Sequence, residues 1–119
     1  MHIVQMINAL RIGGAEKLVV TFARAARTKD LKLTVITLRA NVPQVKQSVL
    51  ETGAGVVELH HRKLFAPGRF YRLVRFLQQE NVDIIHTHLA MANILGAASG
   101  WLAGIPVVTT LHNVSSGSE

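Results

Sequence analysis

The sequence predicts a doubly wound, Rossmann-like α/β fold: a parallel sheet of about five strands in the order 3-2-1-4-5, with helices on both faces. Three observations predict it. Short apolar or β-branched runs alternate with stretches whose apolar residues recur at helical spacing. The runs VDII and IPVV are apolar throughout, as strands buried on both faces should be. A glycine pair follows the first run, where such folds begin their first helix.

The expected strands are short runs rich in apolar and β-branched residues. The first is HIVQMI, and the last is PVVTTLH, with Pro106 at its first position, where a strand tolerates proline. Because helical stretches separate the strands, the connections should be right-handed crossovers and the pairing parallel. The strands are expected at 2–7, 32–38, 55–59, 82–88 and 106–112.

The expected helices fill the four intervals between these strands. The second has Pro43 in its first turn and Gly53 as its stop, and the fourth ends near Gly104. The first and third carry apolar residues on one side and basic residues elsewhere on the cylinder. The helices are expected at 15–28, 42–53, 68–80 and 89–103.

The bulk properties favour one globular domain, residues 1–119, with an anionic partner. The chain has 119 residues, no cysteine and a formal net charge of +6. The charge favours phosphates, nucleotides, nucleic acid or anionic lipid, although a plain surface bias would also produce it. Without cysteine, disulfides and cysteine-based zinc sites are excluded, and a reducing cytoplasm is compatible. The start lacks a positively charged leader region, and no apolar run is long enough to span a membrane.

The loop NALRIGGAE opens the first helix with Gly13 and Gly14. Glycine permits unusual backbone angles and close approach of a ligand, and a helix amino terminus attracts a phosphate. The pair is therefore expected to cradle an anion or a sugar oxygen, the alternative being a tight turn without a ligand. The dinucleotide fingerprint G-x-G-x-x-G is absent, but Arg39 after the second strand keeps an NADP-binding module open. No D-x-D metal motif occurs.

Three histidines stand at or near the carboxyl ends of expected strands: His86, His88 and His112. Alternation along a strand puts His86 and His88 on the same face, about 7 Å apart. His86 is interpreted as a core histidine bonded to the backbone, since no third ligand supports a metal site. In the order 3-2-1-4-5, the glycine loop, His88 and His112 should converge on one rim.

Three arginines, Arg69, Arg72 and Arg75, recur at every third position of the third expected helix. They predict a basic stripe for an anionic lipid surface or an acidic acceptor, the alternative being an ordinary solvated face. Sequence-specific nucleic-acid binding is not expected. No helix-turn-helix, zinc-finger or aromatic-rich sheet pattern occurs, and only 5% of residues are aromatic.

Three features together resemble the amino-terminal domain of the retaining glycosyltransferases of family 4, which have the GT-B architecture. They are IGGAEKLVV after the first strand, the segment VDIIHTHLAMANILGAASGWLAGIPVVTTLHN, and the β/α order between them. The resemblance covers essentially the whole chain. It implies transfer of a sugar from a UDP- or GDP-sugar to a glycan or lipid-linked acceptor, with retention of configuration and with neither a metal nor another cofactor.

The resemblance also implies roles for residues. Gly13, Gly14 and Glu16 would form the loop at the donor phosphates and sugar, although Glu16 can also simply favour the first helical turn. His112 would contact the donor sugar near the reaction centre as the catalytic residue. His88 and Asn113 would face the acceptor. Many members are cytoplasmic enzymes held peripherally on the membrane, which would give the arginine stripe a purpose.

The sequence departs from the family pattern at its end. The polar tail SSGSE follows the fifth strand directly, and the donor-binding half of the family is absent. We therefore expect a truncated front part of a longer protein, forming the acceptor side of the cleft and inactive alone because most groups around the leaving diphosphate are missing. Other classes left open are the NADP-binding domain and a non-catalytic module for anionic lipid or a partner protein.

Overall fold

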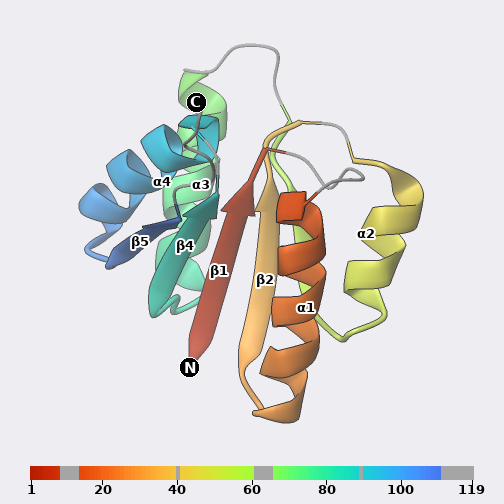
Figure 1. The fold of residues 1–119 in the computed structure, drawn as a ribbon. Helices are drawn as coiled ribbons and strands as arrows, with labels where there is room; N and C mark the ends of the chain where they lie inside the picture. Colours follow the sequence, from red (N-terminus) through yellow and green to blue (C-terminus); the bar gives the residue numbers. More distant parts are fainter. Residues whose placement is uncertain (9–13, 40, 61–65, 89, 111–119) are drawn as a thin grey trace.

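A computed structural model describes residues 1–8, 14–39, 41–60, 66–88 and 90–110. It contains one five-stranded parallel sheet in the order β3-β2-β1-β4-β5 (Figure 1), which confirms the predicted fold class and strand order. The strands are β1 (His2–Ile7), β2 (Lys32–Thr37), β3 (Gly55–Glu58), β4 (Ile84–His88) and β5 (Val107–Thr110). The helices are α1 (Gly14–Thr28), α2 (Pro43–Leu50), α3 (Pro67–Gln79) and α4 (Ala90–Ala103).

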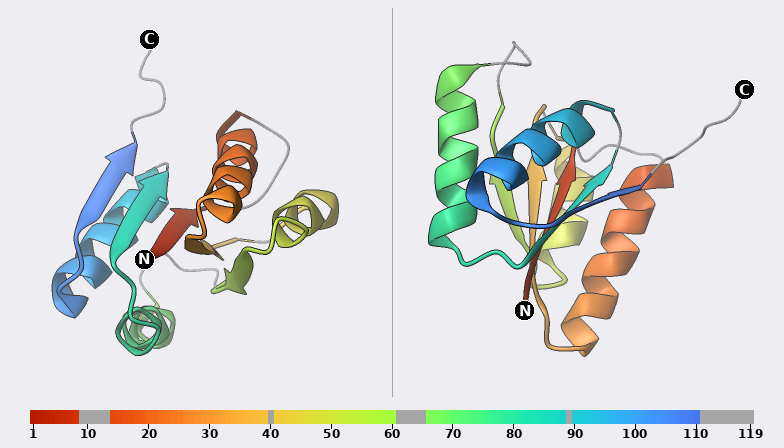
Figure 2. Two further views of the ribbon diagram at one scale, coloured as in Figure 1. Left: turned by 90° about the horizontal axis from the view of Figure 1, so that it is seen from below. Right: turned by 90° about the vertical axis from the view of Figure 1, so that its left-hand side faces the viewer.

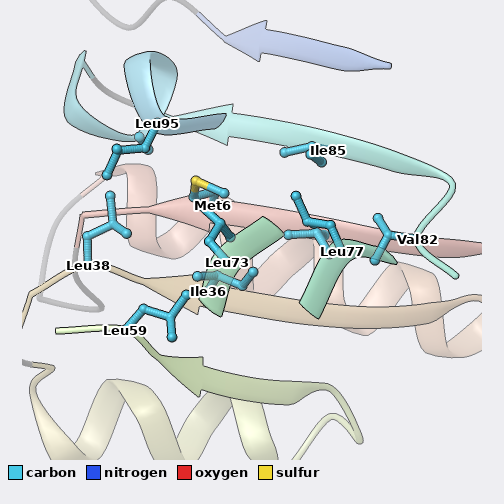
Figure 3. Packing of buried hydrophobic residues seen from close by; sticks show 11 residues of the cluster. Met6, Ile36, Leu38, Leu59, Leu73, Leu77, Val82, Ile85 and Leu95 are labelled. Atoms are coloured by element: carbon cyan, nitrogen blue, oxygen red, sulfur yellow. The ribbon is translucent and has the colours of Figure 1, made fainter. Parts of the chain in front are cut away.

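The helices form two layers, one on each face of the sheet. In the left view of Figure 2, α1 and α3 lie on opposite sides of the strands. One apolar cluster joins α1 and α2 to the sheet through residues such as Ile7, Val19 and Val35. The other joins α3 and α4 to the opposite face, and Figure 3 shows its side chains pointing toward one another. Its largest members include Met6, Ile36, Leu38, Leu73, Leu77 and Ile85.

The central strand β1 is buried along its whole length and is paired on both edges. Alternate residues serve the two clusters: Val4 and Met6 face α3 and α4, while Ile3 and Ile7 face α1 and α2. Gln5 lies on the face covered by α1 and α2 and is only 1% exposed. A buried amide in the middle of the sheet is costly unless it is hydrogen-bonded, so its partners are of interest.

Helix α4 lies close against the sheet because it carries glycine where it crosses the strands. A Cβ placed on Gly96 would overlap the Thr87 side chain, and one on Gly100 would overlap Val107 and lie 3.0 Å from the carbonyl oxygen of Ile105. Neither position has room for a side chain. The helix then ends at Gly104, whose φ of +73° is a conformation that glycine adopts without strain.

The largest difference from the predicted bounds is at α2, which ends at Leu50 rather than at 53, because residues 51–53 form a turn in which Gly53 has a φ of +93°. Two strands also begin later than predicted. The fourth strand begins at Ile84 rather than at 82, because Asn81 has a positive φ and Val82 is buried as part of the turn that leaves α3. The fifth begins at Val107, one residue after Pro106, and its predicted end lies outside the described residues. Pro43 and Pro67 each stand in the first turn of a helix, as their fixed φ favours.

Strand β5 forms one edge of the sheet within the described part of the chain, and β3 forms the other. Strand β5 pairs with β4, and Val108 is 49% exposed. None of the described helices has the length and apolar character to cross a bilayer.

Candidate functional site

The site predicted from the sequence lies at the carboxyl edge of the sheet, and the structure describes part of it. Helix α1 begins at Gly14 near the carboxyl end of β1 (Figure 1), so its free N–H groups lie at that edge. Glu16 is in the first turn of α1. Gly13, His112 and Asn113 lie outside the described residues, so their predicted roles stay predictions.

His86 and His88 lie side by side on β4, with their ring centroids 4.3 Å apart and the rings inclined by 46°. The predicted same-face arrangement is therefore confirmed. Phe22 of α1 packs edge-on to His86 at 6.4 Å, so both histidines belong to the face covered by α1. His88 is buried, whereas His86 is half-buried. The described residues contain no group of three or more side chains suited to holding a metal ion.

Gln5 connects the two rings. Its amide nitrogen donates to Nδ1 of His86 at 3.0 Å, and its Oε1 accepts from Nε2 of His88. This partner is a side chain on the neighbouring strand, in register with His86. From the sequence alone a backbone bond is expected for His86, and no role is predicted for Gln5. The available signal was a lone polar residue inside the apolar run HIVQMI.

Two asparagine side chains at the same edge carry buried oxygens that have no hydrogen-bond partner among the residues that the structure describes. Asn8 directly follows β1, and Asn93 is in the first turns of α4, just beyond the carboxyl end of β4. In the described part of the chain, only their Oδ1 atoms are buried and lack a donor. An unsatisfied buried oxygen costs free energy, so both positions favour a ligand that brings hydroxyl or amide donors. Neither asparagine is predicted from the sequence, because burial of a single atom has no sequence signal.

Arg69 does not belong to the predicted basic stripe, which is a correction. Its side chain is 5% exposed, and its guanidinium donates to the carbonyl oxygens of Leu38 and Leu59 at 3.3 and 3.4 Å. Burial, and secondarily the charge of Arg39, lowers the pKa of Arg69. The reason is helical geometry: Arg69 stands four and eight positions before the buried Leu73 and Leu77, so it lies on the same side of α3 as they do.

Arg72 and Arg75 are exposed on α3, as predicted. The Arg75 guanidinium lies 5.8 Å from the ring centroid of Tyr71 and donates to its hydroxyl at 3.1 Å. Tyr71 is itself 62% exposed. These three residues, with Phe76 and Gln79, line a shallow hollow of about 370 Å³. The exposed basic surface is therefore smaller than predicted and includes an aromatic ring.

A polar network ties α2 to the ends of β2 and β3. Glu58 accepts hydrogen bonds from Lys46 at 3.1 Å and from Asn41 at 2.8 Å, and these bonds lower the pKa of its carboxyl. Asn41 also donates to Thr37, whose hydroxyl is bonded to His60 at 3.2 Å. Arg39, on which the NADP alternative depends, is exposed just beyond β2, and that alternative stays untested.

Several solved structures with this arrangement are glycosyltransferases, and the universal stress protein from Archaeoglobus fulgidus shares it at lower TM-scores of 0.55 and 0.53, with 15% identity. The fold matches HepE (Alr3699) from Anabaena in complex with UDP, and in complex with UDP and glucose, with a TM-score of 0.77, 19% identity and 96% of this chain covered. It also matches a glycosyltransferase from Rickettsia africae (TM-score 0.74, 14% identity, 96% covered) and MurG from Acinetobacter baumannii (0.65, 17%, 91%). At such identities the likeness establishes the fold alone.

The family follows from the sequence itself. Residues 12–118 match the model of Glycosyltransferase Family 4, so the chain belongs to that family. No curated protein sequence matches the chain. The chain spans 30% of the length of HepE and of the Rickettsia enzyme, and 33% of MurG.

Proposed function

We propose that this chain is the acceptor-side domain of a glycosyltransferase that moves a sugar from a nucleotide-sugar to an acceptor with retention of configuration. The observation that carries the proposal is the family match over residues 12–118. The site geometry supports it. Donor groups at the start of α1 suit a phosphate, and the oxygens of Asn8 and Asn93 suit the hydroxyl groups of a sugar.

The donor in this proposal is a UDP- or GDP-sugar. HepE, which shares the fold, was solved with UDP and with UDP and glucose. His112 acts at the donor sugar near the reaction centre, Gly13, Gly14 and Glu16 form the loop at its phosphates, and His88 with Asn113 faces the acceptor. No metal or further cofactor takes part in the proposed reaction, so a chelator should leave the rate unchanged.

The test is transfer by a protein that contains this domain together with a donor-binding half. Radiolabelled UDP- and GDP-sugars are offered with lipid-linked and free glycan acceptors, and the anomeric configuration of the product is read by NMR. We expect a product of retained configuration and a loss of about 100-fold or more for His112→Ala. An inverted product would overturn the mechanism, and the absence of transfer from every donor would overturn the function.

The 119-residue chain alone is proposed to be inactive. It spans 30% of the HepE chain, and the charge developing on the leaving diphosphate needs preorganised groups around it. The same assay run on this chain without the other half should give no product. Turnover by the isolated chain would contradict this part of the proposal.

Peripheral contact with an anionic membrane surface is the second part of the proposal. Arg72, Arg75 and the exposed ring of Tyr71 combine positive charge with an aromatic group, a combination suited to the lipid headgroup region. We expect sedimentation with phosphatidylglycerol vesicles to fall when Arg72 and Arg75 are changed to glutamate. The matched control is Arg24→Glu, an exposed position on α1. Equal sedimentation of all variants would overturn the contact.

A further inference from the structure

The buried amide of Gln5 stands between two histidines on the neighbouring strand. Gln5 is 1% exposed and His88 is 3% exposed, so water does not substitute for their mutual hydrogen bond. Register fixes the arrangement, because Gln5 of β1 is aligned with His86 of β4. The ring of His86 is further held by the edge contact with Phe22 of α1. The three side chains therefore form one connected unit across the middle of the sheet.

The two ends of a glutamine amide have opposite requirements. The NH₂ group only donates hydrogen bonds, and the oxygen only accepts them. With the NH₂ group toward Nδ1 of His86, that nitrogen must be bare and a neutral ring carries its proton on Nε2. With the oxygen toward Nε2 of His88, that nitrogen must carry a proton. Both neutral rings are then Nε2–H tautomers.

Turning the amide by half a turn reverses both requirements together. His86 would then donate from Nδ1 and His88 would accept at Nε2, so both neutral rings would be Nδ1–H tautomers. In either orientation the two histidines share one tautomer. The tautomer of His88 is thus linked to that of His86 through a residue that lies on another strand.

We propose that Gln5 is a positioning residue that fixes the ring orientation of His88 and forces His86 and His88 to share a tautomer. The inference depends on the proposed function only for the role of His88, because that proposal places His88 facing the acceptor.

The test is the protonation pattern of the two rings, read at a pH at which both are neutral. The 119-residue chain is labelled with ¹⁵N-histidine, and long-range ¹H–¹⁵N NMR spectra assign each tautomer. In the unmodified chain we expect the same tautomer at His86 and His88. In Gln5→Glu, whose carboxylate only accepts, the two rings should differ, with Nδ1–H at His86 and Nε2–H at His88. Different tautomers in the unmodified chain, or a tautomer still shared by the two rings in Gln5→Glu, would overturn the inference.

Two further variants keep the test decisive. Gln5→Met has a similar shape without either polar group, so the two rings should no longer be held to one shared tautomer, even where Gln5→Glu does not fold. Thr34→Val is the matched control, since it removes a hydroxyl bonded to a different buried histidine, His2. It should leave the spectra of His86 and His88 as they are. Equal spectra in Gln5→Met and the unmodified chain would overturn the inference.

Kinetics separate this inference from the proposed function. In a protein with both halves, we expect Gln5→Met to lower kcat by about tenfold with little change in KM for the nucleotide-sugar, as loss of a supporting hydrogen bond does at other sites. Shared tautomers in a protein without transfer activity would support the positioning role and overturn the function. Active transfer with kcat unchanged in Gln5→Met would leave the function standing and overturn the positioning role.

Discussion

At the amino end of the sheet, His2 has both ring nitrogens bonded within the chain, whereas at the carboxyl end the oxygens of Asn8 and Asn93 have no partner among the described residues. Nδ1 of His2 donates to the carbonyl oxygen of Glu80 at 3.0 Å, and Nε2 accepts from Thr34 at 2.8 Å. The amino end is therefore completed by the protein itself. The carboxyl end leaves acceptors that a ligand or solvent must satisfy, which is how a binding edge differs from a purely structural one.

The largest expected effect comes from breaking the amino-end network with His2→Ala. The change removes a ring that is 5% exposed and leaves the Thr34 hydroxyl and the Glu80 carbonyl without their partner. Cavity formation and the lost bonds should together lower the free energy of unfolding by about 3 kcal/mol. Urea titration followed by circular dichroism measures it. A loss below about 1 kcal/mol would show that this end is not a structural anchor.

Gly100→Ala should cause the next largest loss of stability, because the added methyl group pushes α4 away from the sheet. The new methyl group would meet Val107, the Ile85 side chain at 3.3 Å and the backbone oxygen of Ile105, which cannot move aside. We expect a loss of about 2 kcal/mol, even after the gain of about 1 kcal/mol from replacing a helical glycine. Thermal unfolding by calorimetry measures this difference.

The control for Gly100→Ala is Gly68→Ala in α3, where an added Cβ has nothing within 4 Å. It should be neutral or stabilise by up to about 1 kcal/mol. If both variants lost the same stability, close packing of α4 would not be the cause.

Two threonines on β2 allow the amino and carboxyl ends of the sheet to be compared through smaller changes in the free energy of unfolding. Thr34 is bonded to the buried ring of His2, whereas Thr37 is bonded to Asn41 and to the exposed His60. Thr34→Val should therefore cost about 1 kcal/mol, and Thr37→Val less, since water can replace the bonds to His60 and Asn41. Equal losses in chemical denaturation, or a larger loss for Thr37→Val, would contradict the comparison.

The smallest expected effect is the loss of stability when Glu58 is protonated at acidic pH. The pKa of Glu58 is lowered in the folded chain, chiefly by the bonds from Lys46 and Asn41, so its contribution to stability is present above its unfolded pKa of about 4.5. That contribution is lost as the pH falls through the lower, folded pKa. Because the side chain is 37% exposed, solvent screening keeps it to a fraction of a kcal/mol.

The measurement for Glu58 is the free energy of unfolding from about pH 6 to about pH 3, in the unmodified chain and in Glu58→Gln. The variant should lose less stability over that range. Identical slopes would mean that the hydrogen bonds of Glu58 contribute nothing to the pH dependence.

The sequence allowed prediction of the strand order and of the placement of His86 and His88 on one face, because both follow from periodicity and crossover handedness. The side-chain partners could not be predicted in the same way. Arg69 looked like its neighbours Arg72 and Arg75, and only the rotation of α3 against the sheet decided that it is buried. Gln5 meets His86 across a distance of 81 positions, which local patterns do not encode.

The central position of β1 sets an order of events during synthesis. Its pairing with β2 uses residues about 30 positions apart and can form early, whereas its pairing with β4 joins Gln5 to His86, 81 positions later. Until β4 has left the ribosome, one edge of the most buried strand stays open, and an open strand edge readily pairs with other chains. A polar glutamine midway along that waiting strand makes it a poorer template for aggregation than an unbroken apolar run would be.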